Sequence, residues 1–431
     1  MKRYETYKDS GIQWWEEIPT HWDLKKAKHM FSLVTENVSD SSLPKIALEN
    51  IESWTGKYIE TDSDFMGEGV EFKKDDILFG KLRPYLAKVY KAEFAGQAVG
   101  DIYVFRGNEE QNPEYLKYLL LSYPFISVVD GSTYGAKMPR ANWDFISHLV
   151  LPCPPKTEQV TIAAFLDNKV GQIDTTIAEK EQMLEDLKAY RSAIVSEAVT
   201  KGLDKNVEMK DSGVEWIGMI PKHWVTKRLK FVSDNFDGTH YSPETKENGK
   251  PYVTAADIRG KGIDYASTKK ISQKDYDRLV EQGCKIENND VLLVKDGATT
   301  GRVGLMIDSE ECVALSSVAM LRPKEGIYPL FLMYCMMSNA MQTQITNSMA
   351  GSAMPRITLT KLNEFVVCVP HLDEQRKIAA FVDGKIEKID RTIDEINIQI
   401  DALKSYKTTL ITEAVTGKID LRDWKPKEEK V

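Results

Sequence analysis

The residues whose chemistry most clearly suggests a binding function are basic side chains in flexible or aromatic-flanked turns. Lys81 and Arg83 stand beside Pro84-Tyr85, while Lys295 and Arg302 flank a glycine-containing turn. Mobile backbone beside lysine and arginine suits an approach to phosphates and base edges. The alternative for any short basic run is a solvated surface. The candidate set is Lys81, Arg83, Lys137, Arg140, Lys295, Arg302, Ser352 and Arg356.

Motifs for enzymatic chemistry are missing. The segment Gly297–Gly304 has Arg302 and Val303 where a phosphate-binding P-loop needs Lys and Ser or Thr. No GxGxxG follows an expected strand, so a dinucleotide site is not supported. Asn112-Pro113-Glu114-Tyr115 lacks the second proline of an amino-methyltransferase motif. The acid and lysine string at 243–246, with Asp237 upstream, is a weak nuclease signal found in one half only.

Histidine and cysteine spacing gives no metal site. His21 and His223 each sit in an Ile-Pro-x-His-Trp turn, which favours packing over a role as catalytic base. The five cysteines are far apart and never form a CxxC pair, which is typical of a reducing compartment. The start of the chain is polar and no run is apolar enough to span a bilayer. The sequence therefore predicts a cytoplasmic protein without membrane association and without a metal or cofactor of its own.

The chain repeats itself. Residues 8–28 match residues 210–230 at 11 of 21 positions, and residues 158–204 match residues 374–420 at 21 of 47 positions. The segments between them, roughly 32–104 and 234–320, scarcely match. A unit of about 200 residues is too long for a solenoid repeat. The duplication predicts two equivalent tasks that differ in detail.

The longer repeated block predicts a long helix in each half. Its apolar positions recur at alternating spacings of three and four, which is the rhythm of a coiled-coil seam. About 40 residues give a rod of roughly 60 Å. We expect the two helices to pair antiparallel, the alternative being that each packs on its own globule. The residues expected to pair are Ile173, Ile177, Leu184, Leu187, Ile389, Ile393, Ile400 and Leu403.

The rest of each half predicts an α+β globule. Short apolar runs at 76–80, 100–105 and 290–294 indicate strands, and Pro113 and Pro329 each begin an expected helix. The net charge is −8, from 57 Lys+Arg and 65 Asp+Glu. The segments 156–204 and 371–420 carry −5 of this net charge, so the globules are nearly neutral. A local basic face is therefore compatible with the negative net charge of the whole chain.

These features resemble the specificity subunit of a Type I restriction–modification system. The resemblance is carried by the Asp-Ser-Gly-x-x-Trp-x-x-x-Ile-Pro-x-His-Trp segments at Asp9–Trp22 and Asp211–Trp224. It is carried also by the Pro-x-x-x-Glu-Gln-x-x-Ile helix start at Pro155–Ile162, by its counterpart at Pro370–Ile378 and by the Glu-Ala-Val-Thr helix ends. The divergent segments match no target-specific pattern.

The resemblance implies a non-catalytic DNA-binding subunit with two target-recognition domains, each reading half of a bipartite, asymmetric site. Two methyltransferase subunits would dock on it and bring S-adenosylmethionine. Restriction/translocase subunits would add ATP and Mg. Phosphate clamping and, for some arginines, bidentate guanine contact are then the expected roles of the basic set. Arg140 and Arg356 have an equal alternative, which is to orient the spacer helix.

The expected fold is α+β, with two α/β globular target-recognition domains in a pseudo-two-fold tandem repeat. Two long antiparallel coiled-coil spacer helices separate the domains. The expected boundaries are 1–155 and 205–370 for the domains, 156–204 for the central helix, and 371–431 for the C-terminal helix and tail. A coiled-coil scaffold without DNA specificity and a stand-alone DNA-modifying enzyme are the alternatives.

Overall fold

The structure is a computed structural model that describes residues 2–37, 42–61, 69–133, 138–307, 310–349 and 356–426. Of the predicted basic set, Lys137 and Ser352 lie outside these residues. The chain divides into two compact units: unit 1 contains Met1–Glu181 and Asn397–Val431, and unit 2 contains Gln182–Ile396. Each long helix is divided between the two units. The expected boundaries, which treat the two globules and the two helices as four separate segments, therefore stay a prediction.

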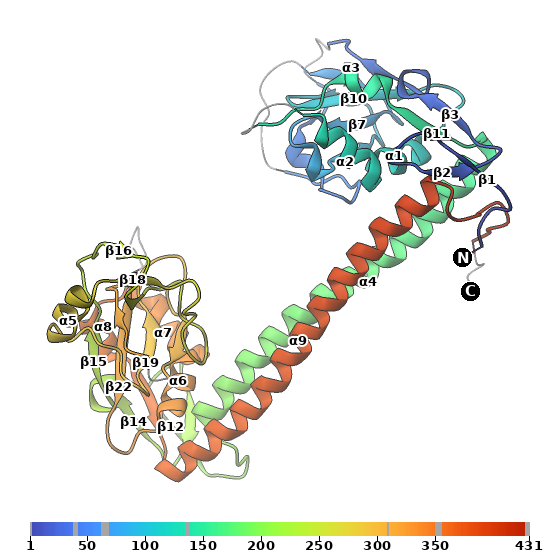
Figure 1. Ribbon diagram of the computed structural model, residues 1–431. Coiled ribbons are helices and arrows are strands. Elements are labelled where there is room, and N and C mark those ends of the chain that lie inside the picture. Colours follow the sequence, from blue (N-terminus) through green and yellow to red (C-terminus); the bar gives the residue numbers. More distant parts are fainter. Residues whose placement is uncertain are drawn as a thin grey trace. The chain divides into compact units, whose positions relative to one another are not determined.

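Unit 1 combines one main sheet, several smaller sheets and short helices (Figure 1). Its main sheet has the strand order β4-β10-β7-β8, and all three pairings are antiparallel. The described elements are β1 (Tyr7–Asp9), β2 (Glu17–Pro19), β3 (Asp23–Lys26), β4 (Phe31–Val34), β5 (Lys45–Ile46), β6 (Val70–Phe72), β7 (Ile77–Gly80), β8 (Val89–Lys91), β9 (Gly96–Ala98), β10 (Ile102–Gly107), α1 (Pro113–Leu121), α2 (Tyr123–Gly131), α3 (Trp143–His148) and β11 (Val150–Cys153).

Unit 2 repeats this plan although its sequence differs. Its main sheet has the order β15-β22-β19-β20, again antiparallel throughout. The described elements are β12 (Met209–Asp211), β13 (Met219–Pro221), β14 (Val225–Arg228), β15 (Ser233–Asp237), β16 (Thr245–Lys246), β17 (Lys250–Val253), β18 (Lys269–Ile271), α5 (Gln273–Glu281), β19 (Val291–Val294), β20 (Val303–Leu305), β21 (Val313–Ala314), β22 (Val318–Pro323), α6 (Pro329–Met337), α7 (Asn339–Met349), α8 (Leu359–Glu364) and β23 (Val366–Val369). The strands expected near 76–80, 100–105 and 290–294 are thus confirmed as β7, β10 and β19.

Two long helices, α4 (Lys156–Lys201) and α9 (Leu372–Val415), follow the two globules in sequence. Within unit 1, Asp174 and Lys180 of α4 contact Lys407 and Gln399 of α9, so the helices run in opposite directions. Within unit 2, Arg191 of α4 donates to Asp390 of α9. The predicted antiparallel pairing is therefore found in both units (Figure 1).

The predicted seam residues face away from solvent to different degrees. Five of the eight are buried, which leaves Leu187, Ile393 and Leu403 half-buried. Apolar side chains at both ends of the pair also enter the core of a globule: in unit 2, Val195 of α4 and Ile378 of α9 belong to the same apolar cluster as the main sheet. Each helix therefore packs both on the other helix and on a globule.

The helices are anchored to their globules by a duplicated polar contact that the sequence did not predict. Glu158, in the first turn of α4, accepts hydrogen bonds from His21 Nε2 at 2.6 Å and from Trp22 Nε1 at 3.0 Å. In unit 2, Glu374 binds His223 and Trp224 in the same way. The two histidines thus belong to a packing motif, and the glutamate of the repeated Glu-Gln at each helix start is its partner.

Candidate nucleic-acid interface

The equivalent strands β7 and β19 each lead into a turn that begins with a predicted basic residue. Lys81 follows β7 and its carbonyl accepts from Ala141 N, and Lys295 follows β19 and its carbonyl accepts from Ile357 N. Lys81 and Lys295 therefore occupy equivalent places in the two units. A local match marks this equivalence in the sequence, because Asp76 and Lys81 recur as Asp290 and Lys295 at a common offset of 214.

In unit 1 a single carboxylate, that of Asp101, lies beside two of the predicted basic residues. Asp101 accepts two hydrogen bonds from Arg140, each at 3.0 Å, and lies 3.9 Å from Lys81 Nζ. Arg83 joins them through its backbone, because Arg83 N donates to Pro139 O at 2.8 Å. The structure thus brings Lys81, Arg83 and Arg140 together on one side of the globule.

The turn that carries Arg83 has an unusual backbone. Arg83 has φ 52° and Ala87 has φ 46°, a left-handed conformation that is costly for residues other than glycine. Trp54 holds the turn by donating its backbone N to Ala87 O and its Nε1 to Tyr85 O, each at 3.1 Å. The Arg83 side chain is exposed, and 47% of Tyr85 is exposed beside it. The fold therefore presents a rigid turn with a cation and an aromatic ring at its tip.

In unit 2 the corresponding turn borders an open hollow of about 830 Å³. Arg302 and Arg259 line it together with Gly297 and Thr299 of the glycine-containing turn. Arg302 is exposed, and no carboxylate among the described residues forms an ion pair with it. Arg259 was not singled out from the sequence, because it stands in a divergent segment without a counterpart. Arg259 pairs with Asp264 at 2.9 Å, so Arg302 is the cation of this hollow that has no ion pair among the described residues.

Lys295 and Arg356 meet at Asp296, which also lines the hollow. Arg356 Nε lies 3.5 Å from Asp296 Oδ1, and 55% of the Arg356 side chain is exposed. Lys295 is different, because only 2% of its side chain is exposed and it pairs with Asp237 at 3.2 Å. Its ammonium does not reach the surface, so the structure supports a positioning role for Lys295 instead of the predicted phosphate contact.

Arg140 and Arg356 had a second expected role at the spacer helix. The ion pairs of both arginines go to aspartates of their own globules, Asp101 and Asp296. Among the described residues, neither guanidinium has an ion pair with α4 or α9. Both guanidinium groups are thus held within their own globules, and both expected roles stay predictions.

A buried ion pair supports the strands on which both sites are built. Arg106 of β10 donates two hydrogen bonds to Asp76, at 2.9 and 2.6 Å, directly before β7. Arg322 of β22 does the same with Asp290, both at 2.9 Å, directly before β19. These four residues were missed, although an aspartate before each strand is a visible signal.

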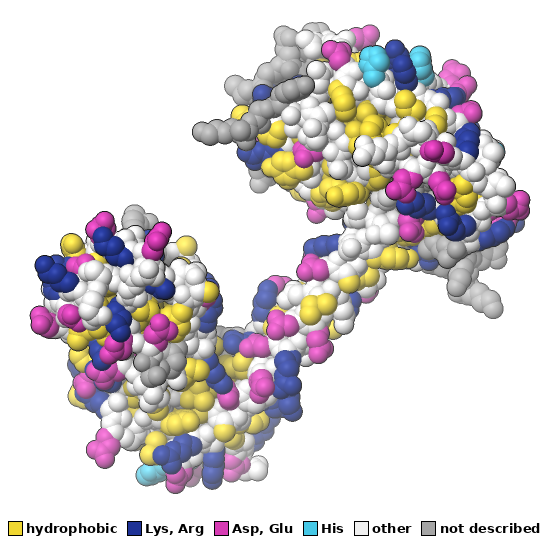
Figure 2. Space-filling view, viewed as in Figure 1, with side chains coloured by type: hydrophobic (Ala, Val, Ile, Leu, Met, Phe, Trp, Pro, Cys, Tyr) yellow, Lys and Arg dark blue, Asp and Glu magenta, His cyan; other side chains and the backbone are white. Residues whose placement is uncertain are grey.

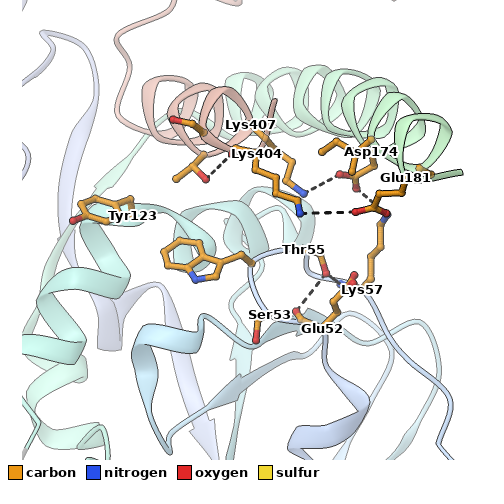
Figure 3. Close-up of a pocket in the computed structure, with 14 residues that line it drawn as sticks. Glu52, Ser53, Thr55, Lys57, Tyr123, Asp174, Glu181, Lys404 and Lys407 are labelled. Carbon is orange, nitrogen blue, oxygen red and sulfur yellow. Dashed lines mark hydrogen bonds and ion pairs between the residues drawn. The ribbon is translucent and has the colours of Figure 1, made fainter. Parts of the chain in front are cut away.

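The helices in unit 1 also border a pocket of about 650 Å³ (Figure 3). Trp54 and Tyr123 stack on its globule side, with ring centroids 6.4 Å apart. On its helix side, Lys407 and Lys57 both pair with Asp174, each at 2.8 Å. Burial alone would raise the pKa of Asp174, but hydrogen bonds from Lys407 and Lys57 outweigh it and hold that pKa below its ordinary value. The charged side chains that line the pocket, apart from Glu52, form ion pairs with one another: Lys57 and Lys407 with Asp174, and Lys404 with Glu181.

The surface and interior of the described residues add three observations. Basic and acidic side chains are intermixed along the face of α4 and α9 that Figure 2 shows. Within the described ranges, no three His, Cys, Asp or Glu side chains gather as a metal site would require. No described helix is both long and apolar enough to cross a membrane.

Comparison with known proteins gives a consistent picture. The chain is 26% identical over 365 residues to the Type I restriction enzyme EcoBI specificity subunit of Escherichia coli, covering 82% of this chain and 75% of that protein. It is 24% identical over 357 residues to the MjaVIII specificity subunit of Methanocaldococcus jannaschii, covering 81% and 77%.

Two solved structures share the fold. One chain, from work on complex assembly and conformational transition of the type I R-M system, superimposes with a TM-score of 0.72 at 17% identity, covering 93% of this chain and 99% of that chain. The HsdS subunit from Thermoanaerobacter tengcongensis gives 0.50 at 17% identity, covering 93% and 98%. The family model described as the Type I restriction modification DNA specificity domain matches residues 32–186 and 221–402. Because these segments cover more than half of the sequence, the chain belongs to the Type I restriction modification DNA specificity family.

Proposed function

We propose that this chain is the sequence-specific DNA-binding subunit of a Type I restriction–modification complex, with each globule reading one half of a bipartite, asymmetric site. The observation that carries the proposal is the shared strand order, β4-β10-β7-β8 and β15-β22-β19-β20, beneath turns of different sequence. A common scaffold holds each basic turn in the same place. Different turns then present different side chains to base edges, as two unlike half-sites require.

The spacer helices set the distance between the half-sites and dock two methyltransferase subunits. Their pairing is supported by the contacts Asp174–Lys407 and Arg191–Asp390, which fix the register of α4 against α9 within each unit. A rod of paired helices resists changes in length, so a gap of about one or more DNA turns, roughly 34 Å each, can be held constant. The mixed charge of the exposed helix faces suits a protein partner better than DNA.

We propose further that catalysis belongs entirely to the partner subunits. The methyltransferase subunits would supply S-adenosylmethionine, and the restriction/translocase subunits would supply ATP and Mg. Support comes from the chain's ionisable groups: Lys295, Asp76 and Asp290 are committed to buried ion pairs that hold the fold. The complex would act on double-stranded DNA in the cytoplasm, without a membrane partner.

The decisive experiment maps methylated bases in host DNA with and without this gene. We expect a bipartite methylated motif to disappear in the deletion strain and to return with the intact gene. A complementing gene with Arg302→Ala should restore methylation weakly or at altered motifs. An unchanged methylation map would overturn the proposal, whereas methylation by the isolated chain would favour the stand-alone enzyme. A scaffold without DNA specificity predicts that methylation persists but loses its motif.

A further inference from the structure

The two ends of the helix pair are sealed differently in the two units. In unit 1, Phe165 of α4 is 3% exposed because Trp424, beyond the end of α9, packs against it. The ring centroids lie 5.4 Å apart in an edge-to-face arrangement. Its sequence equivalent in unit 2 is Phe381 of α9, which is 42% exposed. The same apolar surface is thus covered in one unit and open in the other.

The seal in unit 1 comes from both ends of the chain. Asp420 N donates to Lys2 O, and Arg422 lies over the ring of Tyr4 at 5.1 Å. Tyr4 donates to Glu158, so this layer is tied to the start of α4. Leu421 is buried in the same layer. The residues that precede Trp424 are therefore fixed by contacts with the start of the chain, which in turn is bonded to the start of α4.

The corresponding stretch of unit 2 cannot provide this seal. The chain leaves α4 through residues 202–209, Gly-Leu-Asp-Lys-Asn-Val-Glu-Met, which include no aromatic residue. Lys205 stands where Leu421 is buried in unit 1, and Leu203 is 42% exposed. What remains is a groove of about 430 Å³ beside Phe381, lined also by Tyr190, Ile194, Lys385 and Met209.

We propose that this groove receives an aromatic side chain of a methyltransferase subunit and makes the two docking positions on the chain unequal. The proposal rests on the function proposed above. Its chemical basis is Trp424, because the chain itself covers the equivalent surface with an aromatic ring. Large aromatic residues at the centre of an interface carry much of its binding energy. Lys385 Nζ, 5.7 Å from the Phe381 ring centre, adds a cation at the rim of the groove.

A second copy of this chain is the less favourable occupant. Its Trp424 would have to leave Phe165, so filling the groove of one copy would uncover the apolar surface of the other. A methyltransferase subunit bears no such cost. In unit 1 the same subunit would meet Trp424 in place of an open groove. One partner subunit should therefore bind more tightly than the other.

The test measures binding of the methyltransferase subunit of the same system to the full chain by calorimetry and native mass spectrometry. For the wild type we expect two subunits with unequal affinities. Phe381→Ala should weaken one binding event at least tenfold and leave the other unchanged. Phe231→Ala, which changes a 62% exposed phenylalanine of unit 2 outside both long helices and the groove, is the matched control. A second variant, F381C, should react with a maleimide when alone and be protected once the methyltransferase subunit is bound.

The outcomes separate the two proposals. If the wild type binds no methyltransferase subunit, the proposed function fails. If it binds two and the folded Phe381→Ala chain binds both as tightly as the wild type, only the groove assignment is overturned. Self-association of the wild type that Phe381→Ala abolishes would also overturn it, in favour of a second copy.

Discussion

Lys407 and Asp174 form an ion pair across α9 and α4 in unit 1, with 2.8 Å between Lys407 Nζ and Asp174 Oδ1. Their equivalents at the repeat offset of 216 are Arg191 and Asp390, which pair across the same two helices in unit 2 at 3.0 Å. The aspartate is on α4 in one pair and on α9 in the other. The duplication therefore preserved a cross-helix contact with the helices exchanged.

Replacing Lys407 should weaken the helix pair in unit 1. Lys407→Met leaves the half-buried Asp174 with only Lys57, and we expect a loss of about 1–3 kcal/mol in the free energy of unfolding. Lys407→Arg should be tolerated, because Arg191 performs this role in unit 2. Thermal unfolding followed by helical circular dichroism measures both. Lys404→Met is the control, since its pair with Glu181 is exposed and should contribute about 0–1 kcal/mol. Equal losses for Lys407→Met and Lys404→Met would contradict the assignment.

The same pair predicts a pH dependence. Asp174 has a lowered pKa in the folded chain, since its two lysines outweigh the effect of burial. Its contribution to stability is therefore complete above the unfolded pKa of about 4 and is lost as pH falls through the folded value. The difference in stability between the wild type and Asp174→Asn should be constant from about pH 5 to 7 and shrink below about pH 4. A difference that stays constant down to about pH 2 would show that Asp174 acts by packing alone.

The long helices and their pairing could be predicted because a heptad seam and a repeated block are local in sequence. The heptad spacing alone predicts that Ile173 and Ile389 are buried. The starts of the two helices could also be predicted, since Pro155 and Pro370 precede them. The contact between Glu158 and the His21-Trp22 turn was not predictable in this way, because it joins residues 137 and 136 positions apart.

The basic interface was only partly predictable. Lys81 and Lys295 were chosen from their composition, but the sequence gives no measure of burial for a lysine after a strand. The structure shows that their burial differs. Lys295 is buried and pairs with Asp237, whereas 27% of the Lys81 side chain is exposed. The equivalence of the two sheets was also hidden, because strand order depends on backbone pairing, which different side chains can satisfy equally well.

The buried pair Arg322–Asp290 should be essential to the fold of unit 2. Asp290 is fully buried, so Arg322→Ala leaves a carboxylate without its counter-charge at a cost of about 3–5 kcal/mol. Limited proteolysis and urea unfolding of the full chain measure the effect, and Arg106→Ala should act likewise in unit 1. Arg391→Ala removes an exposed helix pair with Glu387 and serves as the control. A fully stable Arg322→Ala chain would contradict this prediction.

Arg302 should contribute to DNA binding without supporting the fold. We expect Arg302→Ala to lower the affinity of the assembled complex for its site by about 1–3 kcal/mol, or roughly 5- to 150-fold, with an unchanged melting temperature. If the contact is to a phosphate, the slope of log affinity against log salt should fall by about one. Lys295→Met should instead lower the melting temperature, because Asp237 loses the buried ammonium with which it pairs. Binding measured at several salt concentrations distinguishes the two roles, and unaltered DNA affinity would remove Arg302 from the interface.

Asp101 should restrain the basic face of unit 1. Its carboxylate holds Arg140 through two hydrogen bonds and lies near Lys81, so it competes with any phosphate for these cations. Asp101→Asn should therefore strengthen non-specific DNA binding at low salt and steepen its salt dependence. Glu110→Gln, which removes an exposed carboxylate paired with Lys25, is the control for a simple change in net charge. Weaker binding by Asp101→Asn would instead show that Asp101 positions Arg140 for a base, because an arginine aimed at guanine needs a fixed geometry more than it needs a free charge.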